Sequence, residues 1–235
     1  MVAWNAEAPH EKVFSRSDDN SPIHAVDFSP SSTLLVTASE NRTASIWNIT
    51  SHERVSGPFY HEARVIAAKF SPQSDRTFAT ATEKSVCIYG VDDEGNYSFP
   101  VDIPMKVTSY QNTGLVWSNE QLVIISDGKI KTITTPYTSP SEWLAPSGIS
   151  PLFCGIAVAR DAGFIACSAP RTVWLWNMSK LPPTQIRFTR YEGPGTIRVI
   201  APSPDDRFLA IGGEGGVIIE SFVPRIIQVH VHDVR

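Results

Sequence analysis

A short segment of the chain recurs after 42 residues, and this internal repeat limits the possible folds more than any other feature. Phe28-Ser29-Pro30 and Phe70-Ser71-Pro72 stand 42 positions apart, and each triplet closes a run of mostly apolar residues. Each triplet is followed by a run of small and apolar residues, and then by a run rich in β-branched and aromatic residues. Repeats of this length are typical of arrays in which each unit packs only against its neighbours.

The period continues into the second half of the chain. Ser168 and Trp176 stand 129 positions after Ser39 and Trp47, which is three periods of 43 residues. The unit between them, Leu115–Ile133, matches the pattern most weakly. Division of the chain by this period gives about five and a half units. We therefore expect five complete units, preceded by a partial one.

The first complete unit predicts four short strands. Ile23–Phe28 alternates, and Leu34–Ser39 is a continuous run of apolar and small residues, as expected of a strand that is buried on both faces. Thr43–Ile49 is rich in β-branched and aromatic residues, whereas Arg54–Tyr60 is more polar and suits an outer edge. One such sheet cannot cover both of its faces, so radial stacking of like sheets is the expected solution.

The composition agrees with an all-β fold. The 18 prolines and 14 glycines are spread along the chain, which indicates many short elements separated by turns. Hydrophobic residues make up 42% and charged residues 19% of the chain, so we expect a folded core and neither disorder nor a membrane-spanning helix.

These features resemble the WD-repeat family of β-propellers. The resemblance rests on the Phe-Ser-Pro turns, on Leu34–Ser39, and on the strand endings Ile46-Trp47-Asn48 and Leu175-Trp176-Asn177, where the family has Trp-Asp. It implies a β-propeller of four-stranded antiparallel blades, with five complete blades and a partial N-terminal one.

The expected repeats cover about 21–62, 63–104, 105–147, 148–193 and 194–235, after a partial blade of two strands in residues 1–20. The last strand of the fifth repeat is expected at Ile226–Val234. Because the partial blade lacks two strands, three interpretations stay open: an incomplete ring, a piece of a longer protein, or five blades that close with spare strands.

The family's buried hydrogen-bond network is expected to be incomplete. Asn41, Lys84 and Pro170 stand where the family has an aspartate, and His61 alone matches its histidine. The resemblance implies that His61 orients a loop between two blades.

The charge balance and the cysteines exclude several function classes. Twenty Lys and Arg against 24 Asp and Glu give a net charge of -4 without a basic stripe, which disfavours nucleic acid. Cys87, Cys154 and Cys167 form no closely spaced pair, as expected of free thiols in a reducing compartment. We expect a location in the cytoplasm, with the nucleus as the alternative, and no secretion or membrane partner.

Neither catalytic motifs nor metal-site motifs are present in the sequence. The glycine-rich run Ile211–Val217 is interpreted as a tight turn between two strands, because no helix follows to hold a phosphate. His230 and His232 share one face of a predicted strand, yet two ligands are too few for zinc. Val91–Tyr97 is acidic and lacks calcium-loop spacing, so a solvated hairpin is favoured. We predict a protein that is not an enzyme and that needs no cofactor or metal.

The resemblance implies that partners dock on the loop face of the propeller. This face consists of the turns between second and third strands and of the connections into each next first strand. The residues carried over to it are Glu40, Asn41, Arg42, His61, Glu62, Arg64, Glu83, Lys84, Arg171, Tyr191, Glu192 and Glu214. Mixed charges with aromatic residues suit protein binding.

A Pro- and Ser-rich connection surrounds Glu142 and Trp143 and is expected to disrupt the fourth strand of the third unit. A plain surface loop is the favoured interpretation. The alternative is a partner-binding insertion with an exposed Trp143, since loops and Trp residues often carry binding contacts.

The leading functional hypothesis is a non-catalytic scaffold that binds protein or peptide partners. One alternative is the C-terminal sensor region of a larger NACHT-type signalling ATPase, where similar repeat arrays occur. Another is an enzyme with its site in the central channel, which the mostly apolar inner strands disfavour. The oligomeric state is not predicted.

Overall fold

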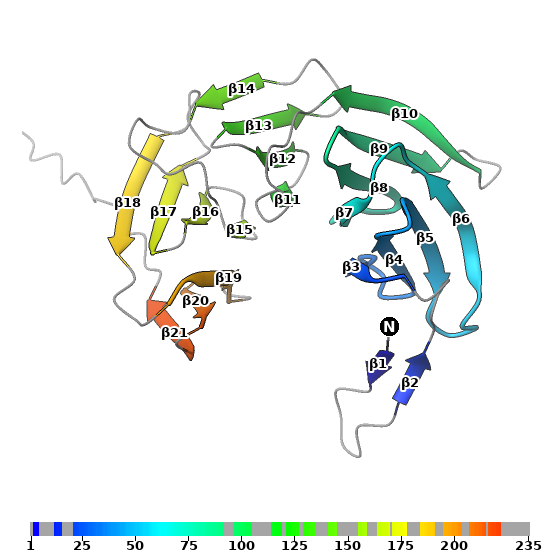
Figure 1. Ribbon diagram of the computed structural model, residues 1–235, viewed down its shortest axis with the longest axis horizontal. Coiled ribbons are helices and arrows are strands. Elements are labelled where there is room, and N and C mark those ends of the chain that lie inside the picture. Colours follow the sequence, from blue (N-terminus) through cyan, green and yellow to red (C-terminus); the bar gives the residue numbers. More distant parts are fainter. Residues whose placement is uncertain are drawn as a thin grey trace, which may run out of the picture.

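The computed structural model describes the chain as a series of β-strands joined by turns (Figure 1). The described residues are 2–4, 12–15, 21–91, 96–104, 114–118, 121–126, 129–134, 141–144, 155–158, 164–169, 171–177, 184–190, 195–203, 207–214 and 216–221. All regular secondary structure within these ranges is β-strand, which confirms the expected all-β class.

Four sheets have four antiparallel strands each, in sequence order across the sheet. The first contains β3 (Ile23–Phe28), β4 (Leu34–Ser39), β5 (Thr43–Asn48) and β6 (Arg54–Tyr60). The second contains β7 (Val65–Ser71), β8 (Ser74–Thr82), β9 (Ser85–Val91) and β10 (Tyr97–Pro104).

The third and fourth sheets repeat this order. The third contains β11 (Gly114–Ser118), β12 (Gln121–Ser126), β13 (Lys129–Thr134) and β14 (Ser141–Leu144). The fourth contains β15 (Gly155–Val158), β16 (Phe164–Ala169), β17 (Thr172–Asn177) and β18 (Thr184–Arg190).

Two smaller sheets lie at the two ends of the described chain. β1 (Val2–Trp4) pairs with β2 (Lys12–Ser15), and β19 (Ile197–Pro202), β20 (Phe208–Gly213) and β21 (Gly216–Ser221) form a three-stranded sheet. The strand expected at Ile226–Val234 lies outside the described residues, as do His230 and His232.

The strands of the first sheet agree closely with the predicted ones; only the third ends one residue earlier, at Asn48. β4 and β5 are buried along nearly their whole length, whereas β6 is mostly exposed, as the sequence predicts. Ser29 explains the recurring Ser-Pro turn. Its backbone N–H donates to the carbonyl oxygen of Leu34 at 2.9 Å, and its hydroxyl accepts from the Leu34 N–H at 3.1 Å. Ser203 and Phe208 form the same pair of hydrogen bonds.

The sheets follow one another in an arc, with the first strand of each sheet toward the inside and the fourth strand outside (Figure 1). Consecutive first strands are in contact from β3 through β7, β11 and β15 to β19. The arc of described strands is open between β19–β21 and β1–β2 (Figure 1).

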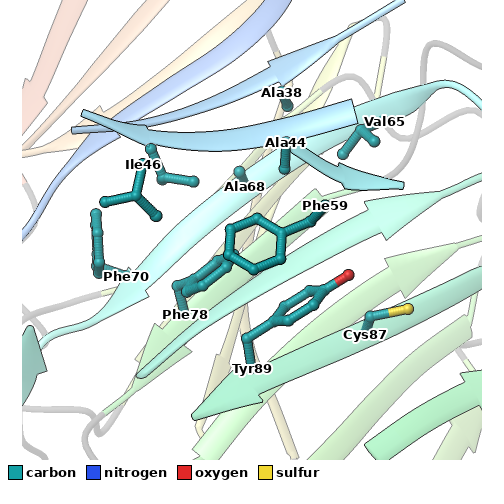
Figure 2. Packing of buried hydrophobic residues seen from close by; sticks show 11 residues of the cluster. Ala38, Ala44, Ile46, Phe59, Val65, Ala68, Phe70, Phe78, Cys87 and Tyr89 are labelled. Carbon is teal, nitrogen blue, oxygen red and sulfur yellow. The ribbon is translucent and has the colours of Figure 1, made fainter. Parts of the chain in front are cut away.

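Buried side chains join neighbouring sheets face to face. Between the first and second sheets, Phe59, Phe78 and Tyr89 form the centre of an apolar cluster (Figure 2). The rings of Phe78 and Tyr89 stack at 4.7 Å, and that of Phe59 tilts against Tyr89 at 4.9 Å. Each aromatic pair adds about 1 kcal/mol beyond the area that it buries. Similar clusters join the second sheet to the third and the fourth to the last.

The third sheet corrects one expectation. Trp143 and Glu142 were expected in a loop that disrupts the fourth strand, yet both lie in β14, where Trp143 pairs with Ile130 and Glu142 with Lys131. This strand has four residues. Trp143 is therefore a strand residue and not a loop residue.

Candidate functional site

The predicted loop face is built by the turns that follow β4 and β8 and by the connection from β6 to β7. Glu40, Asn41 and Arg42 form the first turn, Glu83 and Lys84 form the second, and His61, Glu62 and Arg64 lie in the connection. The structure therefore gathers eight of the predicted residues on one side of the first two sheets.

Arg64 joins the two sheets on this face. Its Nη1 lies 3.3 Å from Oε1 of Glu40, and its Nε donates to Oε1 of Glu83. Glu40 also binds Nε2 of His24. The hydrogen bond from His24, together with the positive charge of Arg64, holds the pKa of Glu40 below its usual value. Glu40, Arg64 and Glu83 thus form a row of alternating charges from the turn after β4 to the turn after β8.

Neighbouring residues complete the charged surface. Nζ of Lys84 lies 3.1 Å from Oε2 of Glu62, and both side chains are well exposed. Asn41 stabilises its own turn, because its side-chain oxygen accepts from the Thr43 N–H at 3.1 Å. Arg42 takes a positive φ of 68° in the same turn, and its side chain is exposed.

The remaining predicted residues do not join this group. Arg171 lies exposed in the turn between β16 and β17. Glu214 lies in the turn between β20 and β21, where it binds Arg198 and Thr196, and Arg198 lowers its pKa. This position confirms that the glycine-rich run is a turn between two strands. Tyr191 and Glu192 lie outside the described residues.

His61 links the first sheet to the second by four hydrogen bonds. Its backbone N–H donates to the carbonyl of Arg42 at 3.0 Å, and its Nδ1 donates to that of Phe59 at 3.0 Å. Nε2 is then the acceptor, and the hydroxyls of Thr80 and Tyr89, both 2.9 Å away, share its single lone pair. Burial lowers the pKa of His61 and so favours this neutral form.

In the first sheet, an aromatic side chain bonds directly to the threonine at the position equivalent to Thr80, with no histidine involved. Nε1 of Trp47 donates to the hydroxyl of Thr37 at 3.1 Å, and this pair corresponds by strand register to Tyr89 and Thr80. In the fourth sheet, Cys167 stands at the register position of Thr37. There Nε1 of the buried Trp176 has no hydrogen-bond partner among the described residues.

Sequence reasoning missed a pair on the inner strands. Nζ of Lys69 lies 2.8 Å from Asp27, whose other oxygen accepts from the Phe70 N–H at 2.9 Å. The signal was available, because Asp27 and Lys69 stand at equivalent positions in two mostly apolar strands. Because the pair is internally neutralised, these inner strands present no convergent set of carboxylates.

Sequence reasoning also missed a hollow of about 250 Å³ at the end of β6, lined among others by Tyr60, His61, Cys87 and Asp102. Burial, reinforced by the negative charge of Asp102, raises the pKa of the Cys87 thiol to about 11. The thiol therefore stays protonated at neutral pH.

Within the described part of the chain, no group of three or more His, Cys, Asp or Glu residues is arranged to hold a metal ion. The described residues also include no helix long and apolar enough to cross a membrane.

A comparison with family models identifies the repeat. Residues 10–48 match the WD domain, G-beta repeat. This confirms the resemblance predicted from the Phe-Ser-Pro turns and the Trp endings. The matched WD repeat contains β2 from one sheet and β3, β4 and β5 from the next. WD repeats are in general non-catalytic modules for protein interaction. No curated protein matches the chain.

Proposed function

We propose that this protein is a non-catalytic interaction platform whose protein partner docks on the loop face. The observation that supports this most directly is the position of Arg64 between Glu40 and Glu83. The ion pairs fix side chains from two sheets in one surface before any partner arrives. Preorganised charges of both signs favour specific docking, because a mismatched partner would leave them desolvated and unpaired.

The exposed residues around these ion pairs provide the contact area. Arg42, Glu62 and Lys84 are exposed on the same face, and the ring of Tyr60 is 73% exposed at the end of β6. Tyrosine and arginine are enriched among the residues that dominate binding energy.

We propose further that the sheets are blades of one β-propeller, with repeats at about 21–62, 63–104, 105–147, 148–193 and 194–235. The arc of sheets and the contacts between consecutive first strands support this arrangement (Figure 1). Residues 226–234 would then supply the fourth strand of the last blade. The cytoplasm is the proposed compartment, on the strength of three cysteines without paired spacing.

A pull-down with charge-reversed variants tests the platform. The 235-residue chain and a variant with R42E, E83K and R171E are compared as baits. Loss of specific partners from the triple variant supports docking on the loop face. Arg76→Glu, at the opposite end of β8, is the matched control and should retain those partners. Unchanged binding by the triple variant would move the docking surface elsewhere.

A further inference from the structure

The hollow at the end of β6 has a shape and a chemistry that the loop-face ion pairs do not use. It opens where Tyr60 and His61 of the first sheet meet β9 and β10 of the second. Cys87 pairs with Asp102 across these two strands, so both side chains lie on the wall that faces the hollow. A cavity volume of about 250 Å³ suits one long side chain better than a larger ligand.

The lining carries one uncompensated negative charge. Glu62 and Lys84 at the rim neutralise each other at 3.1 Å, and His61 is held neutral by burial. Among the described residues, Asp102 accepts a hydrogen bond only from the Cys87 thiol, with Sγ 3.6 Å from Oδ1, and no Lys or Arg pairs with it. A thiol is a weak donor, so this carboxylate keeps most of its capacity to accept hydrogen bonds.

An aromatic ring lines the same hollow as this carboxylate. Tyr60 lines the same hollow, and 73% of its surface is exposed, an unusually large fraction for an aromatic residue. An exposed ring and an open carboxylate in one hollow suit a guanidinium group, which can bind both at once. The planar group donates two parallel N–H bonds to a carboxylate and stacks its flat side on an aromatic ring.

We propose that this hollow binds an arginine side chain of a protein partner, whose guanidinium pairs with Asp102 and stacks on the ring of Tyr60. This inference rests on the proposed interaction function and names the chemistry that the partner must present. The net negative lining disfavours a phosphate or carboxylate ligand. Lysine fits less well, because a point charge can neither form the bidentate pair nor stack.

Peptide binding by the 235-residue chain tests the proposal. N-acetyl-Gly-Arg-Gly-amide is titrated against the protein and followed by NMR, and the isosteric citrulline peptide is titrated in the same way. Citrulline keeps the shape and loses the charge. We expect the arginine peptide to bind at least about tenfold more tightly than the citrulline peptide, and the lysine peptide to lie between them. Equal affinities for arginine and citrulline would overturn the proposal, and this comparison needs no variant.

Two variants locate the site. Asp102→Asn should weaken arginine binding about tenfold, and Tyr60→Ala should weaken it several-fold. Glu53→Gln, an exposed residue at the opposite end of the first sheet, is the matched control and should leave it unchanged. Thermal unfolding of each variant checks the fold. Undiminished binding by a folded Asp102→Asn variant would place the arginine elsewhere and overturn the assignment.

The peptide-binding test of the hollow and the pull-down test of the platform can fail independently. Arginine-selective binding that depends on Asp102 supports the hollow, whether or not the pull-down retains a partner. A partner that is lost from the R42E, E83K and R171E variant, together with arginine-peptide binding that does not depend on Asp102, would support the platform and overturn the arginine site.

Discussion

The hydroxyl oxygen of Tyr89 lies 2.9 Å from Nε2 of His61, and this bond ties the third strand of one sheet to the connection that enters it. Tyr89 is also stacked on Phe78 in the apolar cluster between the sheets (Figure 2). One side chain thus supports both the packing of the two sheets and the conformation of the loop face.

Removal of this hydroxyl is expected to destabilise the protein. Tyr89→Phe keeps the ring stack and leaves His61 with one donor fewer, so the free energy of unfolding should fall by about 1 kcal/mol. Urea unfolding measures this change. Tyr60→Phe, whose ring is exposed, is the control and should change stability little. Equal stabilities of Tyr89→Phe and the wild type would contradict the role given to this bond.

Stability should fall as the pH is lowered from about 7.5 to 5.5, and His61 should contribute to the fall. Burial holds its pKa in the folded chain below the usual value of 6.5. The unfolded chain therefore takes up a proton first as the pH falls through 6.5, which favours unfolding. Urea unfolding at several pH values should show a shallower slope for His61→Gln than for the wild type. Identical slopes would exclude His61 as the cause.

Replacement of Arg64 should bring two carboxylates into repulsion. Arg64→Met leaves Glu40 and Glu83 without their shared cation, and the side chains are only partly exposed. We expect a loss of at most about 1 kcal/mol at low ionic strength, because partial exposure screens such pairs. The loss should shrink in 1 M salt. Lys84→Met, from the more exposed pair with Glu62, should cost less. A larger loss of stability for Lys84→Met than for Arg64→Met would contradict this prediction.

Cys167→Thr is expected to stabilise the fourth sheet. Threonine at this register position would offer Trp176 the acceptor that Thr37 offers Trp47. Satisfaction of a buried indole N–H should gain about 1 kcal/mol, measured by thermal or urea unfolding. Cys167→Val adds a branched side chain without an acceptor and should not produce this gain. A stabilisation shared by both variants would point to packing instead of the hydrogen bond.

The local residue pattern predicted the strands of the first sheet closely, because alternation and turn residues are local signals. Ser29 and Leu34–Ser39 carried these signals clearly. The expectation failed at Trp143, where prolines nearby suggested a loop. Pairing with β13 decided the conformation there, and such pairing depends on residues distant in sequence.

The loop-face residues were predictable as a set, and their partners were not. A turn position can be read from a repeat, but the contact of Arg64 with both Glu40 and Glu83 depends on the angle between adjacent sheets. The hollow at Tyr60 and Asp102 was hidden for the same reason, since 42 residues of sequence separate its two walls.

The WD repeat at residues 10–48 takes one strand from the sheet of β1 and β2 and three strands from the next sheet. The matched repeat is therefore offset by one strand from the sheets. Unfolding of this repeat would remove β2 from the sheet of β1 and β2, and it would remove three of the four strands from the next sheet. The two sheets that share this repeat should therefore unfold cooperatively, even though each sheet packs only against its neighbours.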